Sequence, residues 1–151
     1  MKAVLRAIAA VAALSCAACS SFNQDWKQAA AAPARDPFAG AYEGRWTSAK
    51  HRGASGRLRC VFTRMDDTRY HGRFRANWMA FVSGYDTTFR TARRGDALEF
   101  QGEHDIGALW GGVYRYSGRI ERGRFAARYT SSYDEGTFEM TRQLTKPGRI
   151  P

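Results

Sequence analysis

The sequence predicts an all-β protein, an antiparallel up-and-down β-barrel of about eight strands, preceded by a signal peptide and a flexible tether. From residue 40 onward, short segments alternate between apolar and polar residues, and none of them has helical periodicity. Glycine and aspartate turns separate these segments. Aromatic side chains occupy one face of most segments and arginines the other, which is typical of a sheet closed around an apolar interior.

Eight segments are candidate strands. They cover residues 42–46, 57–62, 70–76, 81–89, 98–100, 114–120, 124–129 and 138–142. The Arg94-Gly95-Asp96 turn precedes the fifth segment, and the turns Glu121-Arg122-Gly123 and Asp134-Glu135-Gly136 follow the sixth and seventh. Such short connections are typical of hairpins. Closure removes the edges of the sheet, and eight strands enclose an interior that is either filled by side chains or holds one small ligand.

The first nineteen residues have the layout of an export signal. Lys2 and Arg6 give a positive start, an unbroken apolar run covers residues 7–14, and small residues and cysteines follow at once. The apolar run is too short for a membrane-spanning helix, which needs about 20 residues. The sequence therefore predicts an exported protein.

The end of this signal, Ala17-Ala18-Cys19, resembles that of bacterial lipoproteins, in which a cysteine becomes the lipid-bearing N-terminus. We predict a lipoprotein signal peptide over residues 1–18 and lipid attachment at Cys19, with Cys16 as the alternative. The resemblance implies several acyl chains, palmitate among them, and firm anchoring to the membrane. Neither cysteine is followed by aspartate, which in that class implies the periplasmic face of the outer membrane.

Three regions are expected after the signal. Residues 19–39 form the tether, because an alanine-rich run with Pro33 and Pro37 favours extended backbone. Residues 40–145 form the barrel domain and residues 146–151 a C-terminal tail. The roughly 130 residues that remain suffice for one domain with a modest core. Within it, Cys60 is expected to be a small buried hydrophobe, or the partner of Cys19 in a disulfide if Cys16 carries the lipid.

The chain is strongly basic, with a net charge of +10 that falls to +8 once Lys2 and Arg6 leave with the signal. Strand alternation predicts eight outward-facing arginines: Arg57, Arg59, Arg73, Arg75, Arg115, Arg119, Arg124 and Arg128. A GC-rich genome would also place arginine where lysine could stand. Because an exported protein meets little nucleic acid, we expect anionic lipid or an envelope polymer, and no nucleic acid, as the charge partner.

Gly44-Arg45-Trp46 opens the first candidate strand, and Arg142 lies in the last. This pattern resembles the signature of calycins, the class that includes lipocalins and avidin-like barrels. In that class, an arginine from a late strand crosses over the tryptophan of an early Gly-x-Trp. The resemblance implies that Gly44, Trp46 and Arg142 form one structural unit at the base of a small calycin-like barrel, held by a cation–π contact.

Nothing in the sequence has the spacing of a catalytic motif, a phosphate loop or a zinc site, so we expect no enzyme, no cofactor and no metal. Four side chains are candidates for the rim of a ligand site at the barrel mouth: Trp78, Met79, Tyr85 and Trp110. The sequence thus favours an envelope lipoprotein whose barrel binds a small amphiphilic ligand or envelope component. The alternative is a periplasmic interaction or inhibitor protein that acts through its loops or basic outer face. A hollow interior would favour the first function and a filled interior the second.

Overall fold

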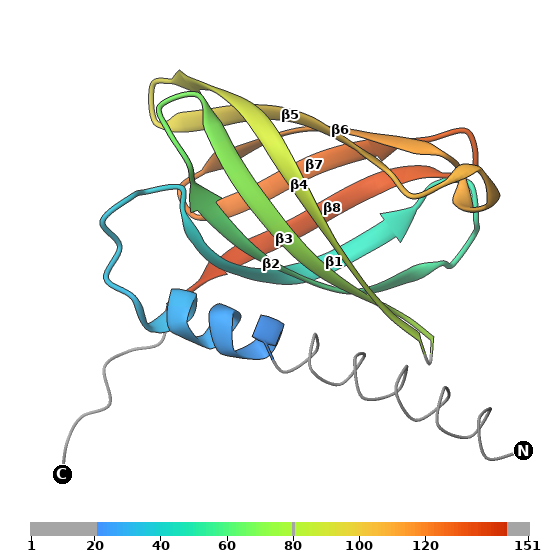
Figure 1. The fold of residues 1–151 in the computed structure, drawn as a ribbon, viewed down its shortest axis with the longest axis horizontal. Helices are drawn as coiled ribbons and strands as arrows, with labels where there is room; N and C mark the ends of the chain where they lie inside the picture. The colour runs from blue at the N-terminus through green and yellow to red at the C-terminus, as the bar shows by residue number, and fades with distance from the viewer. Residues whose placement is uncertain (1–20, 80, 145–151) are drawn as a thin grey trace, which may run out of the picture.

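In the computed structural model, which describes residues 21–79 and 81–144, the chain forms a closed antiparallel barrel (Figure 1). Its strands are β1 (Gly40–Ser48), β2 (Ser55–Arg64), β3 (Arg69–Trp78), β4 (Phe81–Arg94), β5 (Ala97–Asp105), β6 (Val113–Glu121), β7 (Arg124–Thr130) and β8 (Glu135–Gln143). Each strand pairs with the next, and β8 pairs with β1 to close the sheet. The predicted fold class is confirmed, and every candidate strand lies within an observed strand that is longer.

Strict alternation directs the aromatic side chains inward. In β7, Phe125, Ala127 and Tyr129 are buried, whereas the flanking Arg124 and Arg128 are exposed. The same period of two runs along the other strands. Together they fill the interior with side chains that are less than 2% exposed: Tyr42, Leu58, Cys60, Phe62, Phe74, Phe89, Phe100, Ile120 and Phe125.

Glycine allows the first and last strands to approach closely at the seam. Gly44 on β1 lies opposite Met140 on β8. A Cβ atom at position 44 would lie 1.9 Å from the backbone oxygen of Glu139, a distance that no side chain tolerates. Gly44 therefore has a steric role in closing the barrel.

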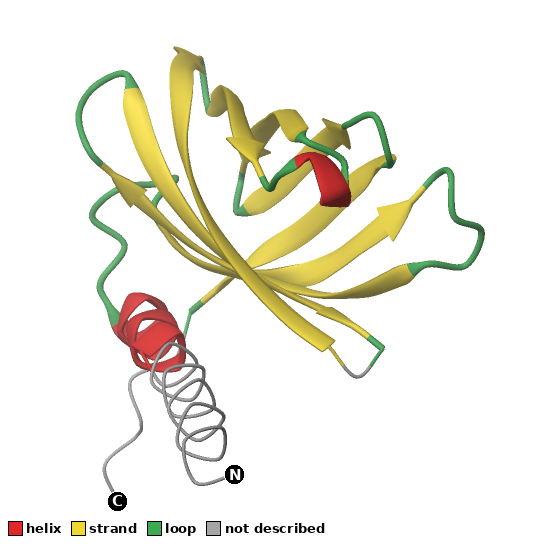
Figure 2. Cartoon of the chain, turned by 45° about the vertical axis from the view of Figure 1, so that its right-hand side comes forward, coloured by secondary structure: helices red, strands yellow, loops and turns green. Residues whose placement is uncertain are grey.

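Residues 21–31 are helical, where the sequence predicted an extended tether. This N-terminal helix packs on the outside of the barrel, as Figures 1 and 2 show. Phe22 and Ala30 are each only 3% exposed, and the Trp26 indole donates a hydrogen bond to the backbone oxygen of Tyr42 at 3.2 Å. Apolar residues at positions 22, 26, 29 and 30 form one stripe along the helix, which the outer face of the sheet covers. Pro33 follows its end, as expected for a residue that cannot continue a helix.

The two ends of the barrel differ. At one end, residues 32–39 form a strap that leads from the N-terminal helix into β1, beside the β2–β3, β4–β5 and β6–β7 turns. We call this the strap end. The other end carries the β1–β2, β3–β4, β5–β6 and β7–β8 connections, and the short helix η1 (Ala108–Trp110) belongs to the third of these. We call this the loop end.

Candidate functional site

The barrel interior is packed with rings. The Phe62 ring centroid lies between 5.0 and 6.0 Å from the ring centroids of Tyr70, Phe89, Phe100 and Phe125. Tyr85 stacks on Phe74 at 5.0 Å and on Tyr116 at 5.9 Å. These distances are those of aromatic contact and leave no room for a ligand between the rings. Two hollows, of about 590 and 370 Å³, lie on the outer surface.

The candidate rim residues do not assemble around a common opening. Trp78 is 50% exposed and Met79 87% exposed at the β3–β4 turn. Tyr85 lies inside the barrel, and burial raises the pKa of its phenol well above the ordinary value. Trp110 ends η1 at the same end of the barrel, but its side chain lies outside what the structure describes. A rim made of Trp78, Met79 and Tyr85 is therefore not formed.

His104 is an inward-facing residue near the end of β5. β5 continues to Asp105, so the alternation that buries Leu98 and Phe100 also turns His104 inward at the loop end. Its ring centroid lies 5.6 Å from that of Tyr85, and the side chain is half-buried. Glu103 and Asp105 occupy the opposite face of the strand. Within the described residues, no three histidine, cysteine or acidic side chains group as a metal site would require.

The structure does not bring Trp46 and Arg142 together. Trp46 lies toward the loop end, opposite Phe138, and its indole Nε1 donates a hydrogen bond of 3.0 Å to the backbone oxygen of Asn77. Arg142 lies four residues further along β8, opposite Tyr42 at the strap end. The strand register therefore separates the two side chains along the barrel, and no cation–π contact joins them.

Arg142 instead fastens the strap to the barrel. Its guanidinium donates hydrogen bonds of 3.0 Å each to the backbone oxygens of Asp36 and Pro37. The Asp36 carboxylate accepts from the amides of Phe38 and Ala39 at 2.8 and 3.0 Å, and from the Tyr70 hydroxyl at 2.9 Å. Burial by itself raises the pKa of Asp36, but these hydrogen bonds outweigh it and hold the pKa below its ordinary value of 3.8. Arg142 and Asp36 thus hold the strap end closed.

A second carboxylate organises the loop end. The buried Asp134 accepts hydrogen bonds from the Ser48 hydroxyl at 2.6 Å, from the Tyr129 hydroxyl at 2.9 Å and from the Glu135 amide at 2.8 Å. Both carboxylate oxygens are used, so the group fixes the β7–β8 connection against the end of β1. The local sequence predicts a turn at residue 134, but it does not indicate that distant residues such as Ser48 bind this carboxylate.

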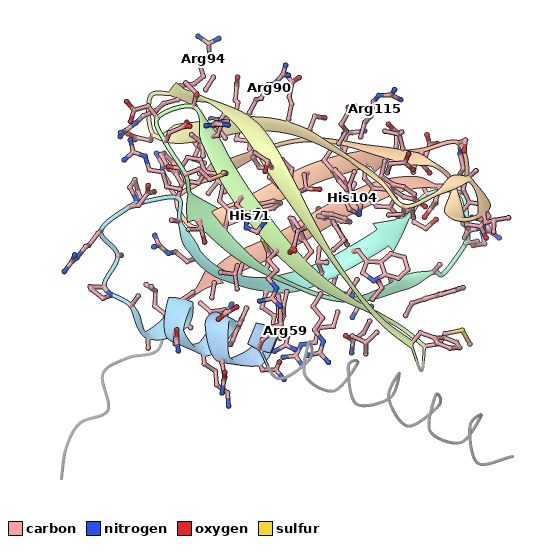
Figure 3. All side chains as sticks on the ribbon, viewed as in Figure 1. Arg59, His71, Arg90, Arg94, His104 and Arg115 are labelled. Atoms are coloured by element: carbon pink, nitrogen blue, oxygen red, sulfur yellow. The ribbon has the colours of Figure 1, made fainter. Side chains whose placement is uncertain are left out.

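The predicted wall of outward arginines divides into two surfaces. On β2 and β3 the N-terminal helix contacts Arg59, Arg73 and Arg75, whereas Arg57 is exposed and pairs with Glu43. The guanidinium carbon of Arg59 lies 5.3 Å from the ring centroid of Phe22 and 5.5 Å from that of Trp26, and Arg73 forms an ion pair with Asp25. Figure 3 shows Arg59 on the side of the barrel that faces the helix. These arginines therefore have an intramolecular role as the docking surface for the helix.

On β6 and β7 the arginines face solvent. Arg119 pairs with Glu121 at 2.9 Å, and Arg115 lies 3.9 Å from Glu103. Within the described residues, no carboxylate pairs with Arg124 or Arg128. Figure 3 shows Arg90, Arg94 and Arg115 pointing away from the barrel on the side opposite the helix. A shallow hollow of about 370 Å³ crosses this outer face between Arg119 and Arg128, lined by Ser117, Ala126, Thr137 and Glu139. We call the surface around Arg115, Arg119, Arg124 and Arg128 the basic face.

Cys60 is fully buried inside the barrel with a free thiol, as expected of a small buried hydrophobe. Burial raises its pKa well above the ordinary value. The two cysteines proposed for lipid attachment, Cys16 and Cys19, lie outside the described residues, as does the predicted tail 146–151. In the part of the chain that the structure describes, no helix combines the length and apolarity needed to cross a membrane.

No protein-family model matches the chain, and comparisons with curated proteins and with solved structures give no significant match. The strand pairing defines the class of the protein, which is a small, closed, eight-stranded up-and-down β-barrel. This architecture is consistent with that of calycins.

Proposed function

We propose that this protein is an exported, lipid-anchored component of the cell envelope that acts through its outer surface as an interaction protein. The filled interior is the observation that favours an interaction protein over a ligand-binding barrel. Nine large or apolar side chains inside the barrel are less than 2% exposed. A small amphiphile would have to displace rings that contact one another, whereas a protein or polymer partner needs only the outer face.

The basic face is the surface that we assign to the partner. Arg124 and Arg128 project from the same outer face of β7, and the exposed Ala126 lies between them. The equivalent surface on β2 and β3 is already occupied by the N-terminal helix. An acidic partner, such as a negatively charged protein surface or envelope polymer, fits a face of this charge.

The proposed lipid anchor is supported by the sequence alone. The apolar run before Ala17-Ala18-Cys19 supports export and lipid attachment at Cys19, and the resemblance to lipoproteins favours the periplasmic face of the outer membrane. Metabolic labelling with a palmitate analogue tests this part. The wild-type chain should be labelled and Cys19→Ser should not be. Loss of label in Cys16→Ser alone would move the site to Cys16, and an unlabelled wild-type chain would refute the anchor.

Two measurements test the surface function. Native mass spectrometry of the protein purified from its own membranes should give the processed, acylated chain with no retained small molecule. A photo-crosslinking amino acid at Ala126 should capture a partner in cells, and Arg128→Glu should abolish the product. Ala31, an exposed alanine on the N-terminal helix, is the matched control position. A stoichiometric retained ligand, or equal crosslinking at both alanines, would contradict the proposal.

A further inference from the structure

Exposed apolar side chains gather at the loop end of the barrel. Met79 is 87% exposed, Phe81 72% and Leu109 94%. Among the described side chains, the other large hydrophobic residues exposed at this end are Trp78, Val82, Ile106 and Tyr133. At the strap end, the large hydrophobic residues exposed within the described chain are Met65 and Leu144. The two ends of the barrel thus differ in polarity.

The β3–β4 hairpin makes the most prominent part of this surface. β3 and β4 remain paired out to Trp78 and Phe81, and Figure 1 shows their tip projecting beyond the neighbouring strands. We call Trp78, Met79, Phe81 and Val82 the apolar tip. A contiguous apolar patch of this kind on a protein surface marks a contact with a membrane or a partner. Nothing inside the barrel requires these side chains, because the core is filled without them.

The direction of the N-terminal helix favours a membrane. Ser21, the first described residue, accepts a hydrogen bond from Arg73 at 2.9 Å, and Asn23 accepts one from Arg75 at 3.2 Å. Ala29 near the end of the helix and Ala32 at the start of the strap line a hollow with Thr63 and His71, nearer the strap end. The helix therefore runs with its N-terminal end toward the apolar tip (Figure 1).

Chain geometry then places the lipid near the tip. Cys19 is two residues before Ser21, a span of at most about 7 Å. Arg73 and Trp78 are five residues apart on β3, or roughly 16 Å. A lipid on Cys19 would thus enter the membrane on the order of 20 Å from the apolar tip, on the same side of the molecule. Lys50 and Arg52, both exposed in the β1–β2 connection, supply cations for anionic head groups at this end.

We propose that the loop end is a lipid-binding surface, and that the apolar tip inserts into the membrane that holds the anchor. This inference rests on the proposed export and anchoring. Side chains such as Trp78 and Phe81 suit the boundary between head groups and acyl chains, where apolar faces penetrate by about 5–10 Å. The anchor holds the protein at the membrane, and the tip fixes its orientation. In that orientation, the strap end faces away from the bilayer.

Two exposed methionines at opposite ends of the barrel allow a matched test. Full-length Met79→Cys and Met65→Cys chains, purified from their own membranes, would each carry a polarity-sensitive fluorophore on the new thiol. Cys60 is buried and does not react in the folded protein, and the unsubstituted chain gives the background from other cysteines. The labelled proteins are reconstituted into phosphatidylethanolamine–phosphatidylglycerol vesicles with brominated acyl chains. We expect several-fold stronger quenching at position 79 than at position 65, with a blue-shifted emission at position 79 only.

Equal quenching at the two positions, or none at position 79, would overturn the inference. A blue shift at position 79 in native membranes but not in lipid vesicles would also overturn it, and would assign the tip to a protein partner. Acyl analysis of the same samples separates the two proposals. An acylated chain without quenching leaves the anchor standing and refutes the inserted tip, whereas quenching without an acyl group refutes the anchor alone.

A variant that preserves the fold completes the test. Met79 has a φ of 51°, in the left-handed region that asparagine tolerates better than methionine does. Met79→Asn should therefore keep the thermal stability of the wild type. With the fluorophore at position 82 in a Val82→Cys background, adding Met79→Asn should reduce quenching severalfold. No quenching in the Val82→Cys background itself would show that the tip does not insert.

Discussion

A single residue, Gly44, allows β1 and β8 to approach closely enough to close the barrel. A Cβ atom at position 44 would overlap the backbone of β8, whereas one at Gly84 would lie 3.4 Å from the backbone oxygen of Phe74, an ordinary contact. We therefore expect Gly44→Ala to lower the free energy of unfolding by about 1–3 kcal/mol or more. Gly84→Ala should change it by less than about 0.5 kcal/mol. Urea denaturation measures both, and similar effects at the two positions would contradict this account of the seam.

Trp46 and Arg142 should act independently, because the strand register places them toward opposite ends. Trp46→Phe removes the hydrogen bond to Asn77 and should cost about 0.5–1.5 kcal/mol. Arg142→Ala removes both hydrogen bonds to the strap. In a double-mutant cycle, the two losses should add to within about 0.5 kcal/mol. A larger coupling would restore the unit that the calycin resemblance implied.

The strands were predictable from sequence because each has a period of two, and β7 with its Arg-Phe-Ala-Ala-Arg-Tyr pattern is the clearest example. The N-terminal helix was not. Its stripe of Phe22, Trp26 and Ala30 is short and lies beside an alanine run with two prolines. Its stability depends on arginines of β2 and β3 that are distant in sequence. Local pattern contains no information on such partners.

The N-terminal helix should therefore detach when its main contact is removed. Phe22 is 3% exposed and lies under the guanidinium groups of Arg59 and Arg73. We expect Phe22→Ala to abolish the hydrogen-exchange protection of the helix amides while the strand amides remain protected, because the barrel closes without the helix. The exposed Lys27, changed to alanine, is the control and should leave protection unchanged. Simultaneous loss in helix and strands would mean that the two form one cooperative unit.

The strap should weaken in acid. The pKa of Asp36 in the folded protein is below its ordinary value of 3.8, so the ionised carboxylate stabilises the fold. This contribution is fully present above the ordinary pKa and is lost as the pH falls through the lower, folded pKa. The difference in melting temperature between the wild type and Asp36→Asn should be constant from pH 7 to about pH 5 and should shrink below about pH 4. A difference independent of pH would show that the charge of Asp36 does not matter.

For the molecule as a whole, eight strands were predictable, but the state of the interior was not. Whether an eight-stranded barrel is hollow depends on strand tilt and on how the rings interlock. Alternation indicates that Phe62, Phe89 and Phe125 point inward, and it says nothing about the distances between them. The sequence placed Trp78 and Met79 at a barrel mouth, but it did not indicate that Phe81, Ile106 and Leu109 are exposed at the same end, because that depends on the topology that brings four connections together.

A cavity-creating substitution tests whether the interior is filled. Phe125 is 1% exposed and contacts four other rings of the core. Phe125→Ala should cost about 3–5 kcal/mol in urea denaturation and leave a cavity. Xenon or benzene should bind this variant and raise its melting temperature, but should not affect the wild type. Binding of either probe by the wild-type protein would reveal a cavity and favour the ligand-binding alternative.

The pairing of β1 with β8 joins residues that lie roughly a hundred positions apart, such as Ala41 and Gln143. This contact has the greatest loop-closure entropy of the sheet, so it forms late in folding. A chain that emerges N-terminus first holds β1 with an unpaired edge until the last strand arrives. A chain that stops before Glu135 leaves both β1 and β7 open, and bare edges of this kind pair readily with a neighbouring copy. The last strand, nine residues long, thus covers the two edges at which neighbouring copies of this chain would otherwise pair.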